Sequence, residues 1–346
     1  MSMENAKQCP ECNGTSPVDR REFIRTAGVG SAAVAASGLV TGAVNTTQAA
    51  TPPEQPRQQR PAEALVRELY TGLNAEQREA VVRPWNHGGG ENRTPTRLGM
   101  YNRPIGRRIG DVYTRPQQEL IERILRAISS GDEGYTKLTR NGTFDGSRTL
   151  QGCGADIFGD PTNGNYSWVF SGHHLTVRCD GDSETNAAFG GPLYYGHSPN
   201  GYSERNCFFY QTRSAMALFD SLNEQQRRAA VVAGSPGERA QSIRFRNEHP
   251  GIPAEDLTED QQTLVQTIMR QLLSPYRQQD ANEVMTILRQ NGGLDQLHLA
   301  FYANGTNREQ PWRFWRIEGP SFVWNFRVLP HVHTFVQIRR TPQQEG

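Results

Sequence analysis

The sequence resembles itself at a nearly constant offset, and this constrains the fold more than any other feature. Three motifs recur in the same order along the chain: Leu69–Arg78 as Leu218–Arg227, Gln117–Arg126 as Gln261–Arg270, and Trp168-x-x-x-Gly172 as Trp315-x-x-x-Gly319. The offsets are 149, 144 and 147 residues. Similarity at a fixed period indicates a repeated structural unit. The sequence therefore predicts two diverged copies of one unit, over residues 65–212 and 213–340.

Each predicted unit begins with helices that carry a capping box. In this motif the N-cap side chain accepts a backbone N–H, and a Gln three residues later bonds the N–H of the N-cap itself. Four pairs have this spacing: Asn74 with Gln77, Thr114 with Gln117, Asn223 with Gln226, and Thr258 with Gln261. Apolar residues at helical spacing follow Gln117 and Gln261, so both helices are expected to bury one face. A further helix is predicted over Ala281–Gln290.

Each unit ends in aromatic and β-branched segments that are typical of strands. The predicted strand segments are Tyr166–Cys179 with a turn at Gly172, Leu297–Tyr302, Trp312–Ile317, Ser321–Val328 and Val332–Ile338. Since helices precede strands in both copies, the predicted fold class is α+β. It consists of two diverged repeats, each with helices followed by an antiparallel β-sheet.

The first 50 residues are typical of an export leader. Asp19-Arg-Arg-Glu-Phe-Ile-Arg25 precedes Ala27–Ala50, which has no charged residue, and this pattern predicts a twin-arginine leader. The predicted partner is therefore the twin-arginine export machinery, and the predicted location is periplasmic or otherwise exported. Residues 51–64, rich in Pro and Gln, are predicted to form a linker. No long apolar stretch follows, so the mature form is not expected to enter a membrane.

Composition and missing motifs exclude several classes of function. The formal net charge is +1 and there is no basic run, which argues against a nucleic-acid partner. Only Lys7 and Lys137 are lysines, and no G-x-x-x-x-G-K-[ST] motif is present, which excludes P-loop nucleotide hydrolysis. The His-Glu-x-x-His, Gly-x-Ser-x-Gly and dinucleotide-binding motifs are also absent.

Histidines are the most suggestive candidates for a functional site. His331 and His333 stand two residues apart in a predicted strand, so both side chains are expected on one face, close enough to share a metal ion. His173 and His174 follow the Gly172 turn, and at most one of them is expected to join such a site. His298 lies in an apolar strand, where a buried imidazole needs a polar partner. His197 and His87 are interpreted as loop residues.

The strand motifs also resemble a known family. Trp168-Val-Phe-Ser-Gly-His173-His174-Leu175, Leu294-Asp-Gln-Leu-His298-Leu-Ala-Phe301, Arg316-Ile-Glu-Gly-Pro-Ser-Phe322 and His331-Val-His333-Thr are similar to segments of the uncharacterised domain of unknown function 3500. The resemblance covers roughly residues 65 to 340 and implies an exported bacterial protein of the same fold. It implies no activity. Relatives tend to carry an acidic residue in the strand before His-x-His, where this chain has Asn325 and Arg327.

These observations favour an exported metalloprotein, with a metal-dependent oxidoreductase or hydrolase activity expected. His174, His331 and His333 are the predicted ligands, and His173 or His298 is predicted as a fourth ligand or as a residue that holds a ligand in place. An imidazole-rich site with no carboxylate nearby in the sequence suits copper or zinc better than magnesium or calcium. Under the offset of 147, Pro320-Ser321 replaces His173-His174, so one asymmetric site is expected between the repeats.

The alternative hypothesis is a non-enzymatic exported protein that binds a ligand or has a structural role. In that case the histidines stabilise strands through hydrogen bonds. The aromatic residues Trp312, Trp315 and Trp324 then form either core or a ligand platform. Tyr194 and Tyr195, beside a Gly-rich loop, would contact an unknown small-molecule or polymer ligand.

Overall fold

The structure, a computed structural model, describes residues 61–91, 93–238, 245–246, 248–303 and 307–341. The predicted leader and the linker as far as residue 60 lie outside the described residues. Helix α2 begins at Pro61, so the last four residues of the predicted linker are helical. Among the described residues, no helix has both the length and the apolar composition needed to cross a bilayer.

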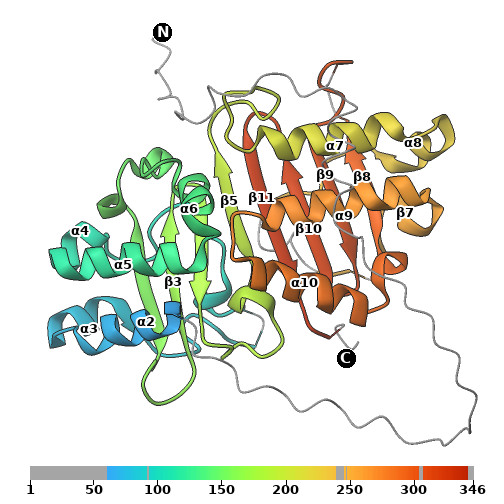
Figure 1. The fold of residues 1–346 in the computed structure, drawn as a ribbon. Helices are drawn as coiled ribbons and strands as arrows, with labels where there is room; N and C mark the ends of the chain where they lie inside the picture. Colours follow the sequence, from blue (N-terminus) through green and yellow to red (C-terminus); the bar gives the residue numbers. More distant parts are fainter. Residues whose placement is uncertain (1–60, 92, 239–244, 247, 304–306, 342–346) are drawn as a thin grey trace, which may run out of the picture. The chain divides into compact units, whose positions relative to one another are not determined.

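The described elements before residue 200 are a group of helices, with a two-residue strand between the second and third α-helices, followed by four strands (Figure 1). The α-helices are α2 (Pro61–Thr71), α3 (Ala75–Val81), α4 (Ile109–Val112), α5 (Arg115–Ile128) and α6 (Gly131–Thr139). The strands are β1 (Val82–Arg83), β2 (Gly154–Gly159), β3 (Tyr166–Gly172), β4 (Leu175–Cys179) and β5 (Leu193–His197). Strands β2 and β5 are absent from the sequence-based prediction.

The described elements after residue 200 also begin with helices and end with four strands, and two short strands lie between the second and third of these α-helices. The α-helices are α7 (Phe209–Ser221), α8 (Glu224–Ala230), α9 (Glu259–Leu273) and α10 (Gln278–Gln290). The strands are β6 (Val231–Val232), β7 (Ile252–Pro253), β8 (His298–Tyr302), β9 (Phe314–Gly319), β10 (Phe322–Arg327) and β11 (Val332–Ile338). The predicted bounds of β11 and the end of α10 agree with the structure.

The described strands form one mixed sheet in the order β1-β2-β3-β4-β5-β11-β10-β9-β8-β6, with β7 paired to β8. The β1–β2 and β6–β8 pairs are parallel, and the others are antiparallel. The α+β class is therefore confirmed. The prediction of a separate antiparallel sheet in each unit is not met, because β5 pairs with β11 from Val332↔His197 to Val336↔Leu193 and makes the sheet continuous.

The two faces of the sheet have different coverings. The helices lie on one face (Figure 1), where alternate strand residues such as Trp168, Trp315 and Val336 join the main hydrophobic core. Trp312, Trp315 and Trp324 are all at most 1% exposed and belong to this core, so they form no ligand platform. On the opposite face a smaller apolar cluster contains Tyr194, Val323 and Phe335, covered by Met100 and Phe245.

All four predicted capping boxes are present in the structure. Their glutamines have a second role that the sequence does not reveal. The side chains of Gln226 and Gln261 bond each other reciprocally, at 2.8 and 3.0 Å, and Gln77 and Gln117 do the same at 2.8 and 3.1 Å. Each pair therefore joins the first turns of two helices.

Candidate metal centre

Three imidazole rings converge where β11 begins beside the β3–β4 turn. The Nε2 atom of His331 lies 3.2 Å from Nε2 of His174 and 3.1 Å from Nε2 of His333. All three ligand atoms lie within 4.8 Å of one another. Around a tetrahedral zinc ion with bonds of about 2.0 to 2.1 Å, two imidazole nitrogens are about 3.3 to 3.4 Å apart. The spacing of the rings is thus close to that of a three-histidine metal site.

His174 reaches this point through an unusual turn. His173 and His174 join β3 to β4, and His174 has a φ of 56°, a left-handed conformation that costs a non-glycine residue about 1 kcal/mol or more. Backbone contacts hold the turn. The His173 N–H donates to Ser147 Oγ at 2.8 Å, and the His174 N–H donates to Asn102 Oδ1 at 2.7 Å. This conformation directs the imidazole of His174, only 2% exposed, toward His331.

Asp145 fixes the orientation of the His174 ring. Its Oδ2 atom lies 2.9 Å from His174 Nδ1 and 3.3 Å from His197 Nδ1, and it accepts from the Ser198 N–H at 3.0 Å. Burial alone would raise the pKa of Asp145, but its contacts with the rings of His173, His174 and His197 hold that pKa well below its usual value. An ionised carboxylate requires a proton on His174 Nδ1, which leaves the Nε2 lone pair free.

A second carboxylate and an arginine lie beside His333. Nδ1 of His333 lies 3.2 Å from Glu238 Oε1, and Arg327 Nη1 donates to Glu238 Oε2 at 2.6 Å. Nη2 of the same guanidinium donates to His331 Nε2 at 3.0 Å and to His333 Nε2 at 2.6 Å. Because a guanidinium has only donors, both Nε2 atoms must act as acceptors.

The three rings are neutral at physiological pH. Burial lowers the pKa of His174 to about 3, a shift that Asp145 partly offsets. Burial and the positive charge of Arg327 lower the pKa of His331 to about 4 and that of His333 to about 2. Neutral imidazole is the form that ligates metals. All three rings can therefore present a lone pair to the same point.

The other histidines named from the sequence have different surroundings. The ring of His173 lies against that of His174, with centroids 3.8 Å apart, and its Nδ1 accepts from the Gly146 N–H at 3.0 Å. His298 is on β8, three strands away from β11 in the sheet, and its ring lies 5.4 Å from that of His249. It is therefore not part of the cluster. His197, interpreted as a loop residue, ends β5 and contacts Asp145.

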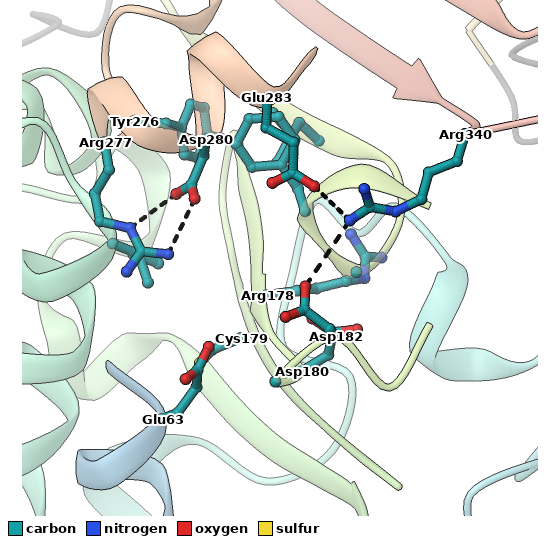
Figure 2. Close-up of a pocket in the computed structure, with 15 residues that line it drawn as sticks. Glu63, Arg178, Cys179, Asp180, Asp182, Tyr276, Arg277, Asp280, Glu283 and Arg340 are labelled. Atoms are coloured by element: carbon teal, nitrogen blue, oxygen red, sulfur yellow. Dashed lines mark hydrogen bonds and ion pairs between the residues drawn. The ribbon is translucent and has the colours of Figure 1, made fainter. Parts of the chain in front are cut away.

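A separate cavity lies between residues of the β4–β5 region and α10 (Figure 2). Three of its acidic side chains are paired with arginines: Arg277 Nε donates to Asp280 at 2.8 Å, and Arg340 contacts both Glu283 and Asp182. Oδ2 of Asp180 accepts from the Glu184 N–H at 2.8 Å, and this hydrogen bond stabilises a turn over residues 180–184. The histidines of the centre do not line this cavity.

The sequence-based prediction missed the residues that surround the histidines. Asp145, Glu238 and Arg327 each contact at least one of the three rings, although no carboxylate stands near these histidines in the sequence. Asp145 has a positive φ of 48° and begins a three-residue 3-10 helix, and Glu238 follows a Pro-Gly pair in a loop. Neither residue belongs to a periodic sequence pattern from which its place in the site could be predicted. Arg327 ends a strand, and only the pairing of β10 with β11 reveals its place.

Comparison with known proteins identifies a family and nothing closer. No curated protein matches the chain. No solved structure matches it. The family model described as "Protein of unknown function (DUF3500)" matches residues 56–344, which is most of the 346-residue chain and includes every histidine of the cluster. This chain therefore belongs to the DUF3500 family.

Proposed function

We propose that this protein is an exported metalloprotein whose metal ion is bound by His174, His331 and His333. One observation carries the proposal: three imidazole lone pairs point at one another. Asp145 sets the proton of His174 on Nδ1, and Arg327 requires lone pairs on Nε2 of His331 and His333. Arg327 supplies a donor to His331 and His333, but the lone pair of His174 Nε2 faces that of His331 Nε2 at 3.2 Å, and two such lone pairs repel unless a cation lies between them. A metal ion removes this repulsion.

The ligand set favours copper or zinc. Imidazole suits these ions, whereas magnesium and calcium prefer oxygen ligands. Asp145 beside His174 Nδ1 is the carboxylate–histidine arrangement commonly found around metal-ligating imidazoles. Three protein ligands leave a coordination position open, which is typical of catalytic sites. Zinc would supply an activated water for hydrolysis, and copper would supply electron-transfer or oxygen chemistry.

The proposal also includes an internal duplication of the chain and export of the folded protein. The strand order supports two units, because β1-β2-β3-β4-β5 is mirrored by β6-β8-β9-β10-β11 across the β5–β11 pair. His174 belongs to the first proposed unit, and His331 and His333 belong to the second. The twin-arginine pattern at Arg20-Arg21 supports export in the folded state, which allows a metal to be inserted before export.

Metal content tests this proposal directly. The mature protein, residues 51–346 without an affinity tag, is purified after export through its own leader and analysed by plasma mass spectrometry. We expect about one copper or zinc ion per chain, and loss of that ion in the His331→Ala/His333→Ala double variant. A His249→Ala/His298→Ala variant is the matched control, because it removes two imidazoles outside the cluster. Metal-free parent protein of full stability would overturn the proposal.

A second candidate is a structural role for the same residues. The specific observation in its favour is that Arg327 Nη2 donates to His331 Nε2 and His333 Nε2, which places a protein cation among the ligand atoms. In this case the cluster is a hydrogen-bonded network that holds β10, β11 and the β3–β4 turn together. The metal measurement distinguishes the two, since a structural network predicts a stable parent protein without bound metal.

A further inference from the structure

Strand pairing places Arg327 at the proposed centre. Arg327 of β10 and His333 of β11 are direct partners in the antiparallel register, so their side chains lie on the same face of the sheet. This face is the one opposite the helices, where Tyr194 and Phe335 also lie. Arg327 therefore reaches the imidazoles because of its register, and a shift of one residue would move it to the other face.

Two contacts away from the ligand atoms hold the guanidinium in place. Its Nε donates to the carbonyl oxygen of His331 at 3.1 Å, and its Nη1 donates to Glu238 Oε2 at 2.6 Å. The side chains of Arg327 and Glu238 are only 13% and 19% exposed. Nη2 is thus the part of the guanidinium that faces Nε2 of His331 and of His333.

Metal binding would remove the acceptors of Nη2. An ion on the three histidines uses the Nε2 lone pairs that now accept from Arg327. The two N–H groups of Nη2 would then lie beside the ion without hydrogen-bond acceptors. An unsatisfied donor in a partly buried site costs free energy. The guanidinium keeps its charge, so two cationic groups would also lie side by side. A negatively charged acceptor between the ion and the guanidinium would accept from the N–H groups of Nη2 and offset the repulsion between the two positive charges.

We propose that the centre binds an oxyanion, a carboxylate or phosphate group, with one oxygen on the metal and another on Nη2 of Arg327. This inference rests on the proposed function, because it requires the ion on His174, His331 and His333. An anion with two or more oxygens can place one oxygen on the ion and another on the N–H groups of Nη2, in a charge-assisted hydrogen bond. His174 is buried, whereas His331, Arg327 and Glu238 are partly exposed, so the oxyanion enters from the side of Arg327.

Cobalt provides a visible probe of this binding. The mature protein is loaded with Co²⁺, its cobalt content is measured, and its visible absorption is followed while inorganic phosphate or sodium acetate is added. Sodium chloride at equal ionic strength is the control for the anion. The variants are Arg327→Gln and Arg327→Lys, with Arg313→Gln as the matched control, since Arg313 is an exposed cation just before β9. Circular dichroism checks that each variant is folded.

We expect phosphate or acetate, but not chloride, to change the cobalt spectrum of the parent protein and of Arg313→Gln. The dissociation constant of that oxyanion should rise at least tenfold in Arg327→Gln and by less in Arg327→Lys, with cobalt content unchanged. The phosphate and acetate arms distinguish the two sources of the oxyanion.

Several outcomes would overturn the inference. Equal oxyanion affinity in the parent and in Arg327→Gln, or an equal response to chloride, would show that Arg327 does not select an oxyanion. Tighter cobalt binding in Arg327→Gln with unchanged oxyanion affinity would show that the guanidinium only weakens metal binding by charge repulsion and does not bind the oxyanion. Failure of the folded parent to bind cobalt would overturn the proposed metal centre itself, a result distinct from the others.

Discussion

Among single residues, Asp145 has the greatest control over the geometry of the centre. Its carboxylate contacts the rings of His174 and His197 and accepts two hydrogen bonds from Ser198, at 3.0 Å from the backbone N–H and 2.6 Å from Oγ. These contacts fix both the position of the ring of His174 and the nitrogen that carries its proton. The residue lies 29 positions from His174 in the sequence, so only the fold brings the two together.

The Asp145→Asn variant tests this control. The amide has the same shape but cannot accept from two imidazoles as a carboxylate does, so His174 loses its fixed tautomer. We expect metal affinity to fall about 10-fold to 100-fold, measured by competition with a chelator of known affinity. Asp132→Asn, at a side chain that is 97% exposed, is the control. Unchanged affinity in Asp145→Asn would show that the carboxylate does not orient the ligand.

A different buried carboxylate gives a pH-dependent prediction. Asp156 on β2 is 0% exposed, and neither of its oxygens accepts a well-formed hydrogen bond. Burial raises its pKa from 3.8 to about 6, an effect that Arg83 and the Gly106 backbone offset only in part. Since the folded pKa is above the unfolded value, the folded protein retains the extra proton between pH 3.8 and about 6. Burial of the ionised Asp156 carboxylate lowers the free energy of unfolding. This loss of stability is therefore absent below this pH range and fully present above it.

Asp156→Asn should consequently stabilise the protein at pH 7 and have little effect at pH 4. The expected gain in the free energy of unfolding at pH 7 is about 3 kcal/mol, from a pKa shift of about two units at about 1.4 kcal/mol per unit. Urea unfolding at both pH values measures it, with the exposed Asp220→Asn as control. A gain of the same size at pH 4, or no gain at pH 7, would contradict this account.

At the scale of residues, local spacing predicted that two of the histidines lie together, but it did not predict the rest of the cluster. The His-x-His spacing led to the expectation that His331 and His333 lie together, and the structure places their Nε2 atoms 3.1 Å apart. The choice between His173 and His174 depends on a left-handed turn that strand alternation does not describe. Asp145, Glu238 and Arg327 come from a short 3-10 helix, a loop and a strand end, so their approach depends on tertiary structure.

At the scale of elements, the capping glutamines link helices in pairs. Gln261 caps α9, while its Nε2 also donates to Gln226 at 3.0 Å and to the Ser221 carbonyl at 2.9 Å. Gln226 and Gln261 are 8% and 5% exposed, so a lost partner is not readily replaced by water. The sequence predicted each capping box, because that motif is local. The bonds between the boxes were not predictable, because they depend on how two helices meet.

The Gln226–Gln261 pair should therefore show coupling in a double-mutant cycle. We expect Gln226→Ala and Gln261→Ala each to lower the free energy of unfolding by about 1 to 3 kcal/mol, because each leaves a buried amide without its partner. The double variant should cost less than the sum of the two. Gln266→Ala, on an exposed position of α9, is the control. Additive losses measured by urea unfolding would contradict the proposed coupling.

At the scale of the whole molecule, one pair of strands determines how the sheet is built. β5 and β11 are antiparallel partners over five residue pairs and connect strands that are far apart in the sequence. The local pattern predicted most of the strands and the α+β class. The single sheet was not predictable, because β5 was interpreted as a tyrosine-containing loop and the order of strands depends on long-range pairing. For the same reason the sequence did not separate His298 from the other histidines.

Residues 61–212 should not fold stably without the rest of the chain. In this fragment the edge of β5 loses its hydrogen bonds to β11, and Leu193 on the same strand loses a neighbour in the core. We expect an aggregated product, or one without a cooperative unfolding transition, by size-exclusion chromatography and thermal circular dichroism. The control is the full mature chain under the same conditions. A monomeric fragment with a cooperative transition would show that residues 61–212 fold independently.

The separation of the histidines along the chain has a consequence for biosynthesis. His174 and His331 are 157 positions apart, and His333 lies on β11, after the other strands of the described sheet. A nascent chain that ends before His331 therefore has His174, Asp145 and most of the described sheet but lacks the other two imidazoles. The cluster forms only after β11 has been synthesised and has paired with β5. Filling of the cluster would thus mark chains in which β11 is made and paired, and products that end before His331 would remain without it.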